Sequence, residues 1–392
     1  MNRRAFLASA VAPYLAGALS AANAPLRRAA IIGHTGRGNY GHKLDVVWQK
    51  IPNVEIVGVA DADPEGLKKA MARLGTHQGF SDYRKMLESI QPEFVSVAPR
   101  HVDQHLEMAL AAIEAGASGL YVEKPFCRTP SEADQLIAAA EKKGAKIAVA
   151  HRNRYHPVLP VIKRLLADGA IGRLLEIRAN GKGDRRGGSE DLWVLGSHVL
   201  NLFQYFGGEP ETCSAMILQN GKLATSKDVT EGPEGLGLIA GDEVHAQWHL
   251  SSGLVASYKS FANDGSKGKG YAAHLIGTNG MITLEIDANP LAWLIPGSPA
   301  NPASREEARI PIFTAGLGEA EPHPETITQV QNHVLAVQDL IDSVDSDRPP
   351  LCDAHQGAMA VEMICSVFES HRQGGARVPF PLTERGNPWA KF

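Results

Sequence analysis

The sequence predicts an α/β fold with two domains, in which a parallel sheet is followed by an open, mostly antiparallel sheet. The first observation is length, because 392 residues are too many for one ordinary domain and suit two. The second is that apolar runs alternate with helical patterns from Arg28 to about Ala150, which is typical of a parallel sheet covered on both faces. The third is a two-residue period of apolar residues in later runs, which favours antiparallel strands.

The first 24 residues predict an export signal. Arg3 and Arg4 precede a short, alanine-rich apolar stretch that Pro13 interrupts, and Ala22-Asn23-Ala24 suits a cleavage site. The adjacent arginines are similar to those of a twin-arginine signal, which exports folded proteins. We therefore expect residues 1–24 to be a signal peptide and the mature protein to lie in the periplasm. A general secretory signal and a disordered N-terminus are the alternatives.

Residues 25–150 are expected to form the first domain. The expected strands are Ala29–Gly33, Val54–Asp61, Phe94–Ala98, Gly119–Glu123 and Lys146–Ala150, and the expected helices include His42–Lys50, Gln104–Ala115 and Pro130–Lys143. The last helix has clear end signals, because Thr129 is a suitable cap, Glu132 follows three residues later and Gly144 stands at its end.

Residues 151–392 are expected to form the second domain. Helices over Val158–Ala167 and Leu192–Phe206 precede strands over Glu243–Leu250, Leu254–Phe261, Ala272–Ile276 and Met281–Ile286. Asn279-Gly280 between the last two strands is a hairpin signal. Pro290–Pro324 is rich in Pro, Ala and Gly and is predicted to be a long surface loop, and helices over Thr326–Val344 and Ala354–His371 close the chain. This order predicts an open sheet with helices on one face.

The strongest functional signal is a glycine-rich loop after the first strand. The loop runs Gly33-His34-Thr35-Gly36-Arg37-Gly38-Asn39-Tyr40-Gly41, and Asp61 ends the second strand twenty residues beyond Gly41. A glycine turn lets backbone N–H groups approach a pyrophosphate, and an acid at the tip of the second strand accepts hydrogen bonds from an adenosine ribose. Gly33, Gly36, Gly38 and Asp61 therefore predict a Rossmann domain that binds NAD. Arg37 could pair with a 2′-phosphate, which leaves NADP open, and a glycine turn without a ligand is the other alternative.

Two further strands end in residues that could serve a cofactor. Pro99-Arg100-His101 follows the strand Phe94–Ala98, and Glu123-Lys124-Pro125 follows Gly119–Val122. Ligands of open α/β sheets bind beyond the carboxyl ends of the strands. A lysine there would lie near a nicotinamide, and its charge would stabilise a developing alkoxide. We therefore assign five further residues to the cofactor site: Pro99, His101, Glu123, Lys124 and Pro125.

These features resemble the Gfo/Idh/MocA oxidoreductases, relatives of glucose–fructose oxidoreductase and inositol dehydrogenase. Glu123-Lys124-Pro125 after its strand is the most specific likeness, and Asn153-Arg154-Tyr155-His156-Pro157 and Gly196-Ser197-His198 add to it. The resemblance implies that Lys124 polarises a substrate hydroxyl and that His198 is the general base, a role for which a histidine pKa is suited. It also implies hydride transfer to or from a sugar or polyol, and a homo-oligomer formed through the C-terminal sheet.

One position departs from the family pattern. Many members carry an acid four residues before the histidine, where this chain has Val194. Asp191 lies about one turn earlier and is a candidate replacement. The other candidate substrate contacts are Arg100, Arg154, Tyr155, Asp184 and Arg186. The departure keeps two other functions open, namely redox-neutral cleavage of a glycoside through transient oxidation and non-catalytic binding of a nucleotide or a sugar.

Composition argues against several other classes of partner. The net charge is −4 with no basic run, which disfavours nucleic acid, and no stretch of the mature sequence is apolar for long enough to span a bilayer. The four cysteines fit no metal motif, so we assign no metal site and expect buried thiols. Because free dinucleotide is scarce outside the cytoplasm, an exported protein is expected to hold it tightly.

Overall fold

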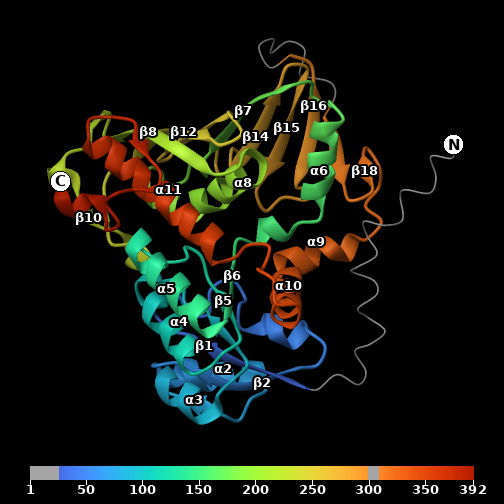
Figure 1. Cartoon of the computed structure of the whole chain (residues 1–392), viewed down its shortest axis with the longest axis vertical. Helices are drawn as coiled ribbons and strands as arrows, with labels where there is room; N and C mark the ends of the chain where they lie inside the picture. The colour runs from blue at the N-terminus through green and yellow to red at the C-terminus, as the bar shows by residue number, and fades with distance from the viewer. Residues whose placement is uncertain (1–25, 299–308) are drawn as a thin grey trace.

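The structure, a computed structural model, describes residues 26–298 and 309–392 and consists of two sheets with their helices (Figure 1). The predicted signal peptide, residues 1–24, lies outside the described residues. The N-terminal sheet is parallel, with the strand order β3-β2-β1-β4-β5-β6 of a Rossmann fold. Its strands are β1 (Arg27–Ile32), β2 (Val54–Ala60), β3 (Gly79–Phe80), β4 (Phe94–Val97), β5 (Gly119–Val122) and β6 (Lys146–Val149).

Four α-helices connect these strands, namely α2 (Pro64–Leu74), α3 (Tyr83–Ile90), α4 (His105–Glu114) and α5 (Pro130–Lys143). The limits predicted for α5 are confirmed, because the Thr129 hydroxyl accepts the Glu132 N–H at 3.2 Å and Gly144 ends the helix with φ of +71°. The five strands predicted here are confirmed to within about two residues. β4 and β5 are buried along their whole length, which explains their mostly apolar sequences.

The helix predicted over His42–Lys50 is wrong in its first half. Residues 41–45 form turns, and a short 3-10 helix, η3, covers only Val46–Lys50. Gly41 and Lys43 have φ of +58° and +76°, left-handed conformations that an α-helix cannot contain. The turn therefore takes the place of the helix N-terminus that was expected to face the pyrophosphate.

The C-terminal sheet has eleven strands and is mostly antiparallel, as predicted; β7 and β13 form its parallel pair in the described chain. Its path runs β18-β17-β16-β15-β14-β7-β13-β12-β8-β19, with β9 paired to β8. The strands are β7 (Leu174–Asn180), β8 (Pro210–Gln219), β9 (Lys222–Leu223), β12 (Glu243–Leu250), β13 (Val255–Phe261), β14 (Ala272–Gly277), β15 (Gly280–Glu285), β16 (Ala292–Pro296), β17 (Ile310–Phe313), β18 (Gly316–Leu317) and β19 (Val378–Pro379). A small separate ribbon pairs β10 (Thr230–Glu231) with β11 (Leu238–Ile239).

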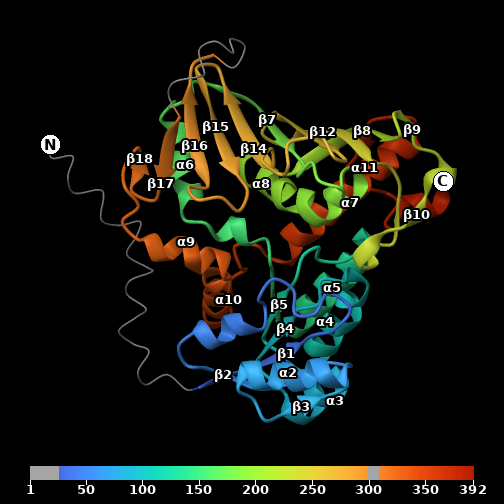
Figure 2. The same cartoon turned by 180° about the vertical axis from the view of Figure 1, so that it is seen from behind.

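Helices lie against one face of this sheet (Figure 2). They are α6 (Val158–Ala167), α8 (Ser197–Gly207) and α11 (Ala354–Arg372), and α7 (Ser189–Asp191) and the π-helical turn η6 (Leu192–Gly196) precede α8. Along β12 the buried and less buried positions alternate, as the two-residue period predicts. The hairpin predicted at Asn279-Gly280 is confirmed by the antiparallel pair β14 and β15.

Two predictions about the C-terminal third are corrected. The loop predicted over Pro290–Pro324 contains β16, β17 and β18 within its described part, because Leu291, Ala292 and Leu294 are buried in the sheet. The helix predicted over Thr326–Val344 is two helices, α9 (Pro324–Gln331) and α10 (Val334–Asp345), which separate at His333 with φ of +62°.

The last two α-helices of the chain, α10 and α11, contact the first domain. α10 packs beside β5 and β6, and α11 packs against α5 as well as β8 (Figure 1). The two domains are therefore connected by more than the chain at residue 150. All four cysteines are buried free thiols, as expected. No helix in the described ranges has the length and apolarity that crossing a membrane requires.

Candidate active site

The glycine loop closes against the end of β4. Gly36 and Gly38 have φ of +85° and +86°, a region that favours glycine. A Cβ on Gly38 would clash with the backbone nitrogen of Arg100, whereas a Cβ on Gly36 would meet nothing within 4 Å. Gly38 thus allows the loop to touch the chain after β4, and Gly36 leaves the outer side of the loop open.

Asp61, directly after β2, is buried at 2% exposure. Its carboxylate accepts the backbone N–H groups of Thr35 and Asp63, both at 3.0 Å, and the hydroxyls of Thr35 at 2.7 Å and Tyr40 at 2.8 Å. A carboxylate has about four lone-pair positions, and these donors fill them. Asp61 therefore ties the glycine loop to β2, and a ribose hydroxyl would have to displace one of these donors. The predicted ribose contact stays a prediction.

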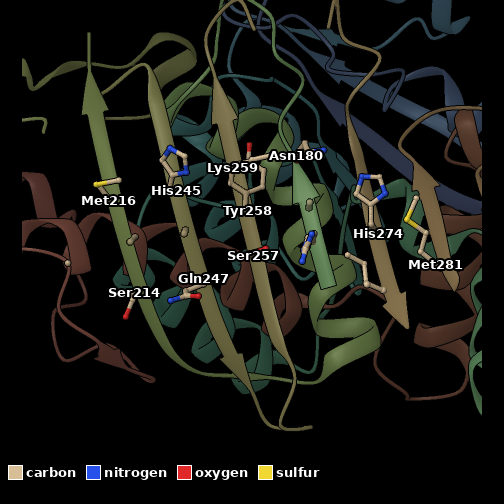
Figure 3. A pocket seen from close by; sticks show the side chains of 16 residues that line it. Asn180, Ser214, Met216, His245, Gln247, Ser257, Tyr258, Lys259, His274 and Met281 are labelled. Atoms are coloured by element: carbon tan, nitrogen blue, oxygen red, sulfur yellow. The ribbon is translucent and has the colours of Figure 1, made fainter. Parts of the chain in front are cut away.

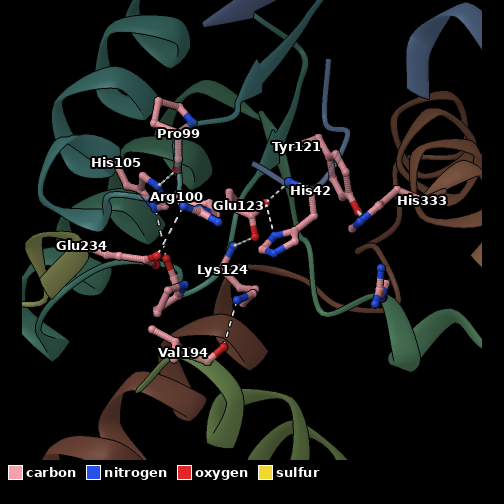
Figure 4. Close-up of polar contacts among 12 residues, drawn as sticks. His42, Pro99, Arg100, His105, Tyr121, Glu123, Lys124, Val194, Glu234 and His333 are labelled. Carbon is pink, nitrogen blue, oxygen red and sulfur yellow. Dashed lines mark hydrogen bonds and ion pairs between the residues drawn. The ribbon is translucent and has the colours of Figure 1, made fainter. Parts of the chain in front are cut away.

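Two arginines, one in the loop and one after β4, bring positive charge to this region. Arg37 forms an ion pair with Asp103, and Nη2 of Arg100 lies 3.5 Å from Oε1 of Glu234 in the second domain (Figure 4). In both guanidinium groups Nε is buried and finds no hydrogen-bond partner within the described chain. A pyrophosphate beside the open Gly36 side would gain charge-assisted hydrogen bonds from such groups. The residues present therefore fit the phosphates of a dinucleotide.

A histidine that was not predicted joins the ends of β4 and β5. His105, the first residue of α4, is fully buried, and its Nε2 lies 2.7 Å from the carbonyl oxygen of Pro99 (Figure 4). Its Nδ1 lies 3.0 Å from the carbonyl oxygen of Pro125. The imidazole therefore lies between the carbonyl oxygens of both prolines assigned to the cofactor site and can donate its N–H to one of them. His101 lies nearby before the 3-10 turn η4 (Val102–Gln104), and burial lowers its pKa.

Glu123 is fully buried after β5 and binds the turn that follows the glycine loop. Its Oε2 accepts the backbone N–H of His42 at 3.0 Å and lies 3.2 Å from Nδ1 of the His42 ring (Figure 4). Burial opposes ionisation, but the hydrogen bond and charge of His42 outweigh it and lower the pKa of Glu123 to about 2. Glu123 thus connects β5, as an anion, to the turn that follows the glycine loop.

Lys124 reaches from the first domain to the second. Its side chain is buried, and Nζ donates a hydrogen bond to the carbonyl oxygen of Val194 at 2.9 Å (Figure 4). Burial lowers the pKa of Lys124, and the charge of Glu123 opposes that effect. Val194 lies in the π-helical turn η6, a kind of turn that is frequent at functional sites. The residue that departs from the family pattern therefore holds Lys124 through its backbone.

His198, near the start of α8, lies on the second-domain side of the same site. Its ring packs edge-to-face on His151, with 5.4 Å between the ring centroids, and its buried Nδ1 has no partner among the residues that the structure describes. Burial lowers the pKa of His198 well below its usual value, and the charge of Lys124 adds to this effect. We call Lys124, His151, His198 and the Val194 carbonyl the interdomain site.

Two of the candidate substrate residues contact the chain between α10 and α11. They belong to the 3-10 turn η5 (Arg152–Tyr155). Arg154 Nε donates to the carbonyl oxygen of Leu351 at 3.2 Å, and the Tyr155 hydroxyl lies 3.5 Å from that of Cys352. Neither side chain hydrogen-bonds to Lys124 or His198 in the described chain.

The acids predicted to contact substrate have partners inside the second domain. Asp184 pairs with Arg186, with Nη2 and Oδ2 2.5 Å apart. Asp191 is fully buried, and its Oδ2 accepts the hydroxyls of Ser260 at 2.6 Å and Tyr258 at 3.1 Å. Asp191 therefore stabilises the fold behind η6. Its substitution for the missing acid stays a prediction, as do the substrate roles of Asp184 and Arg186.

Fold and site together define the class of two-domain oxidoreductases in which an NAD-binding Rossmann domain precedes an α/β domain. Residues 27–151 match the family model described as the oxidoreductase family, NAD-binding Rossmann fold, and residues 163–380 match that of the C-terminal alpha/beta domain. The chain belongs to the Gfo/Idh/MocA oxidoreductase family.

Two curated relatives are named sugar dehydrogenases. The chain is 28% identical to levoglucosan dehydrogenase of Pseudarthrobacter phenanthrenivorans over 255 residues. This alignment covers 58% of this chain and 64% of the relative. It is 34% identical over 192 residues to D-apiose dehydrogenase of Paraburkholderia graminis, which covers 46% of this chain and 51% of the relative. The chain therefore aligns with about half to two thirds of the length of these relatives.

Solved structures share the fold over nearly the whole chain. Levoglucosan dehydrogenase in complex with NADH and L-sorbose superposes with a TM-score of 0.72 at 20% identity, covering 92% of this chain and 100% of that chain. The WlbA dehydrogenase of Bordetella pertussis in complex with NADH and UDP-GlcNAcA gives a TM-score of 0.66 at 18% identity, with 92% and 100% covered. At these identities the likeness concerns the fold.

Proposed function

We propose that the protein transfers hydride between a bound nicotinamide dinucleotide and a hydroxyl-bearing carbon of a sugar or polyol. The observation that carries the proposal is the buried Lys124 amine, fixed at 2.9 Å on the Val194 carbonyl in the same site as His198. An ammonium group stabilises a developing alkoxide, and a neutral imidazole accepts the hydroxyl proton. The dinucleotide, held at the glycine loop, supplies the hydride acceptor or donor. The family and the names of the two relatives support this substrate class.

The test uses mature protein, added dinucleotide and a panel of levoglucosan, D-apiose, L-sorbose and myo-inositol. Nicotinamide absorbance should change with at least one sugar. The change should be lost in Lys124→Met, which keeps the length of the side chain and removes the amine. If the protein binds dinucleotide, no member of the panel changes its absorbance and no aryl glycoside is cleaved, the non-catalytic alternative, a sensor of nucleotide or sugar, is favoured instead.

We also propose that the protein is exported in the folded state with its dinucleotide bound tightly. A segment that we call the strap, residues 230–239, supports tight binding. The strap contacts two residues beside the glycine loop: Glu234 pairs with Arg100, and Gly235 lies against Asp103, the partner of Arg37. Leu236 anchors the strap with a fully buried side chain. Such a strap would slow release of the cofactor.

Truncating the anchor tests the strap. Leu236→Ala should cost about 2–5 kcal/mol of local packing and release bound dinucleotide faster than the parent does. The matched control is Leu223→Ala on β9, because Leu223 is 60% exposed and its truncation should leave release unchanged. Equal release rates in all three proteins would rule out a role for the strap, and purified mature protein without bound dinucleotide would argue against tight binding.

A second candidate function is redox-neutral cleavage of a glycoside through transient oxidation. The observation that favours it is the second buried imidazole, His151, beside His198, because elimination after oxidation requires one more proton acceptor than oxidation alone. A cofactor that stays bound would be regenerated in each turnover. Release of aglycone from aryl glycosides without net change in nicotinamide absorbance would favour this function over net dehydrogenation.

We further propose a homo-oligomer formed through the open face of the C-terminal sheet. Figure 3 shows this face, where a hollow of about 700 Å³ is lined by polar and apolar side chains of neighbouring strands. Met216 is 42% exposed there, beside His245 and Gln247. Light scattering should give a multiple of the chain mass, and Met216→Arg should lower it. A monomeric parent protein would contradict the proposal.

A further inference from the structure

Sheet register brings His151 beside Lys124. β5 and β6 are parallel neighbours in which Val122 pairs with Val149. The pairing continues one residue further, because the Ala150 N–H donates to the Val122 carbonyl at 2.9 Å. Lys124 and His151 each lie two residues beyond the paired valines, so both emerge at the carboxyl edge where ligands of such sheets bind.

His151 is buried, and its ring nitrogens make few polar contacts. Its exposure is 1%, and Nδ1 has a single weak contact, 3.7 Å to the Cys352 sulfur. Nε2 is buried and has no hydrogen-bond partner in the part of the chain that is described. A buried polar atom without a partner costs about 1–3 kcal/mol and calls for a specific explanation. The His151 ring packs edge-to-face on His198, so its unpartnered Nε2 belongs to the interdomain site.

The charge state of both rings suits proton acceptance. Burial, and then the charge of Lys124, lower the pKa of His151 to about 3, and the same causes lower the pKa of His198. Both imidazoles are therefore neutral at pH 7 and have a free lone pair, but their lowered pKa values make them weak bases until charge develops beside them. A negative charge forming on substrate beside them would raise their basicity during the reaction. Dehydrogenation of an alcohol requires one such base, to accept the hydroxyl proton. It gives the second imidazole no role.

We propose that His151 removes and returns the proton on the carbon next to the transient carbonyl, so that this site exchanges that proton with solvent in addition to transferring hydride. The inference rests on the proposed function, which supplies the carbonyl. In that first step, the hydroxyl-bearing carbon gives its hydride to the bound dinucleotide, and the hydroxyl proton passes to His198.

In the exchange step, the C–H bond of the adjacent carbon breaks and its proton goes to Nε2 of His151. The electron pair of that bond forms an enolate, whose oxygen the Lys124 ammonium stabilises. Return of a proton from His151 restores the ketone, and no oxidant beyond the bound dinucleotide is consumed. Where the next carbon carries a glycosidic oxygen, the same enolate can expel it, so the exchange is also the step that cleavage would require.

The experiment follows deuterium uptake. Mature protein with bound dinucleotide is incubated in D2O with each of levoglucosan, D-apiose, L-sorbose and myo-inositol, and both nicotinamide absorbance and deuterium at each sugar carbon are followed, the latter by NMR. A sugar that exchanges hydride should also take up deuterium at the carbon next to the oxidised one. His151→Phe, which keeps a ring of similar shape, should lose about 100-fold in uptake, the size of a general-base effect, and much less in hydride transfer.

Matched variants separate this role from packing. His198→Phe should lose both hydride transfer and uptake, whereas His156→Gln, which removes a buried histidine of the neighbouring turn, should lose neither. If His151→Phe does not fold, His151→Gln, which keeps a polar group near Cys352 but no base, gives the same comparison. Hydride transfer without deuterium uptake in the parent, or unchanged uptake in the His151 variants, would overturn the inference. Absence of hydride transfer with every sugar would overturn the proposed function and the inference with it.

Discussion

Asp61 offers the sharpest prediction about how the glycine loop is held. Asp61→Ala removes one carboxylate that accepts four hydrogen bonds, two from backbone N–H groups and two from the hydroxyls of Thr35 and Tyr40. Hydrogen bonds to a charged group contribute about 1.5–3 kcal/mol each, but water can enter the space left by the side chain and replace part of them. We therefore expect a loss of about 3–5 kcal/mol in the free energy of unfolding.

Tyr40→Phe is the internal standard, because it removes one of the four donors and keeps the carboxylate. It should lose about 1–2 kcal/mol. Urea unfolding followed by circular dichroism gives both values from the shift in midpoint, and a fluorescence titration with NADH gives the affinity, which we expect Asp61→Ala to weaken by about 1–3 kcal/mol.

Two results would contradict this reasoning. If Asp61→Ala loses no more stability than Tyr40→Phe, the four-donor arrangement does not hold the loop. If stability falls while the affinity for NADH is unchanged, Asp61 supports the fold and has no contact with the ribose.

Three further predictions concern the same edge of the sheet. Lys124→Ala should abolish turnover and keep the dinucleotide bound, because the amine serves the substrate; normal turnover would exclude its role. Glu123 contributes stability that is present above about pH 4.5 and is lost as pH falls towards its folded pKa of about 2. The deficit of Glu123→Gln in unfolding free energy at neutral pH, up to about 3 kcal/mol, should therefore shrink in acid, and a deficit independent of pH would refute this. Gly38→Ala should lower the melting temperature more than Gly36→Ala. Both variants place alanine at positive φ, at a cost of about 1–2 kcal/mol, but only at Gly38 would the new Cβ clash with the Arg100 backbone. Equal melting temperatures would contradict this prediction.

Much of the fold could be predicted because its signals are local. The strand Phe94–Val97 is a short apolar run buried on both faces, and α5 has a cap residue and a terminal glycine at its ends. Failures occur where long-range packing outweighs local composition. Pro, Ala and Gly between Pro290 and Pro324 suggested a loop, yet buried residues such as Leu294 pair there with the edge of the sheet.

From the sequence, the site could be predicted only where it consists of side chains. Lys124 and His198 were predicted, and the structure connects them through the Val194 carbonyl, which lies four residues before His198 and accepts a hydrogen bond from Lys124. The hydrogen-bond acceptor of Lys124 is the backbone carbonyl of Val194, which every residue type would offer, so no sequence signal could reveal it. His105 and His151 were missed because a histidine at a strand end or a helix start is ordinary, and only the packing of β4, β5 and β6 shows what each ring faces.

The most direct test of the account is a crystal structure of the mature protein with NADH. The account predicts the pyrophosphate on the open side of Gly36 and the nicotinamide ring between Lys124 and His198. A dinucleotide bound elsewhere, or a ring that neither side chain approaches, would contradict it.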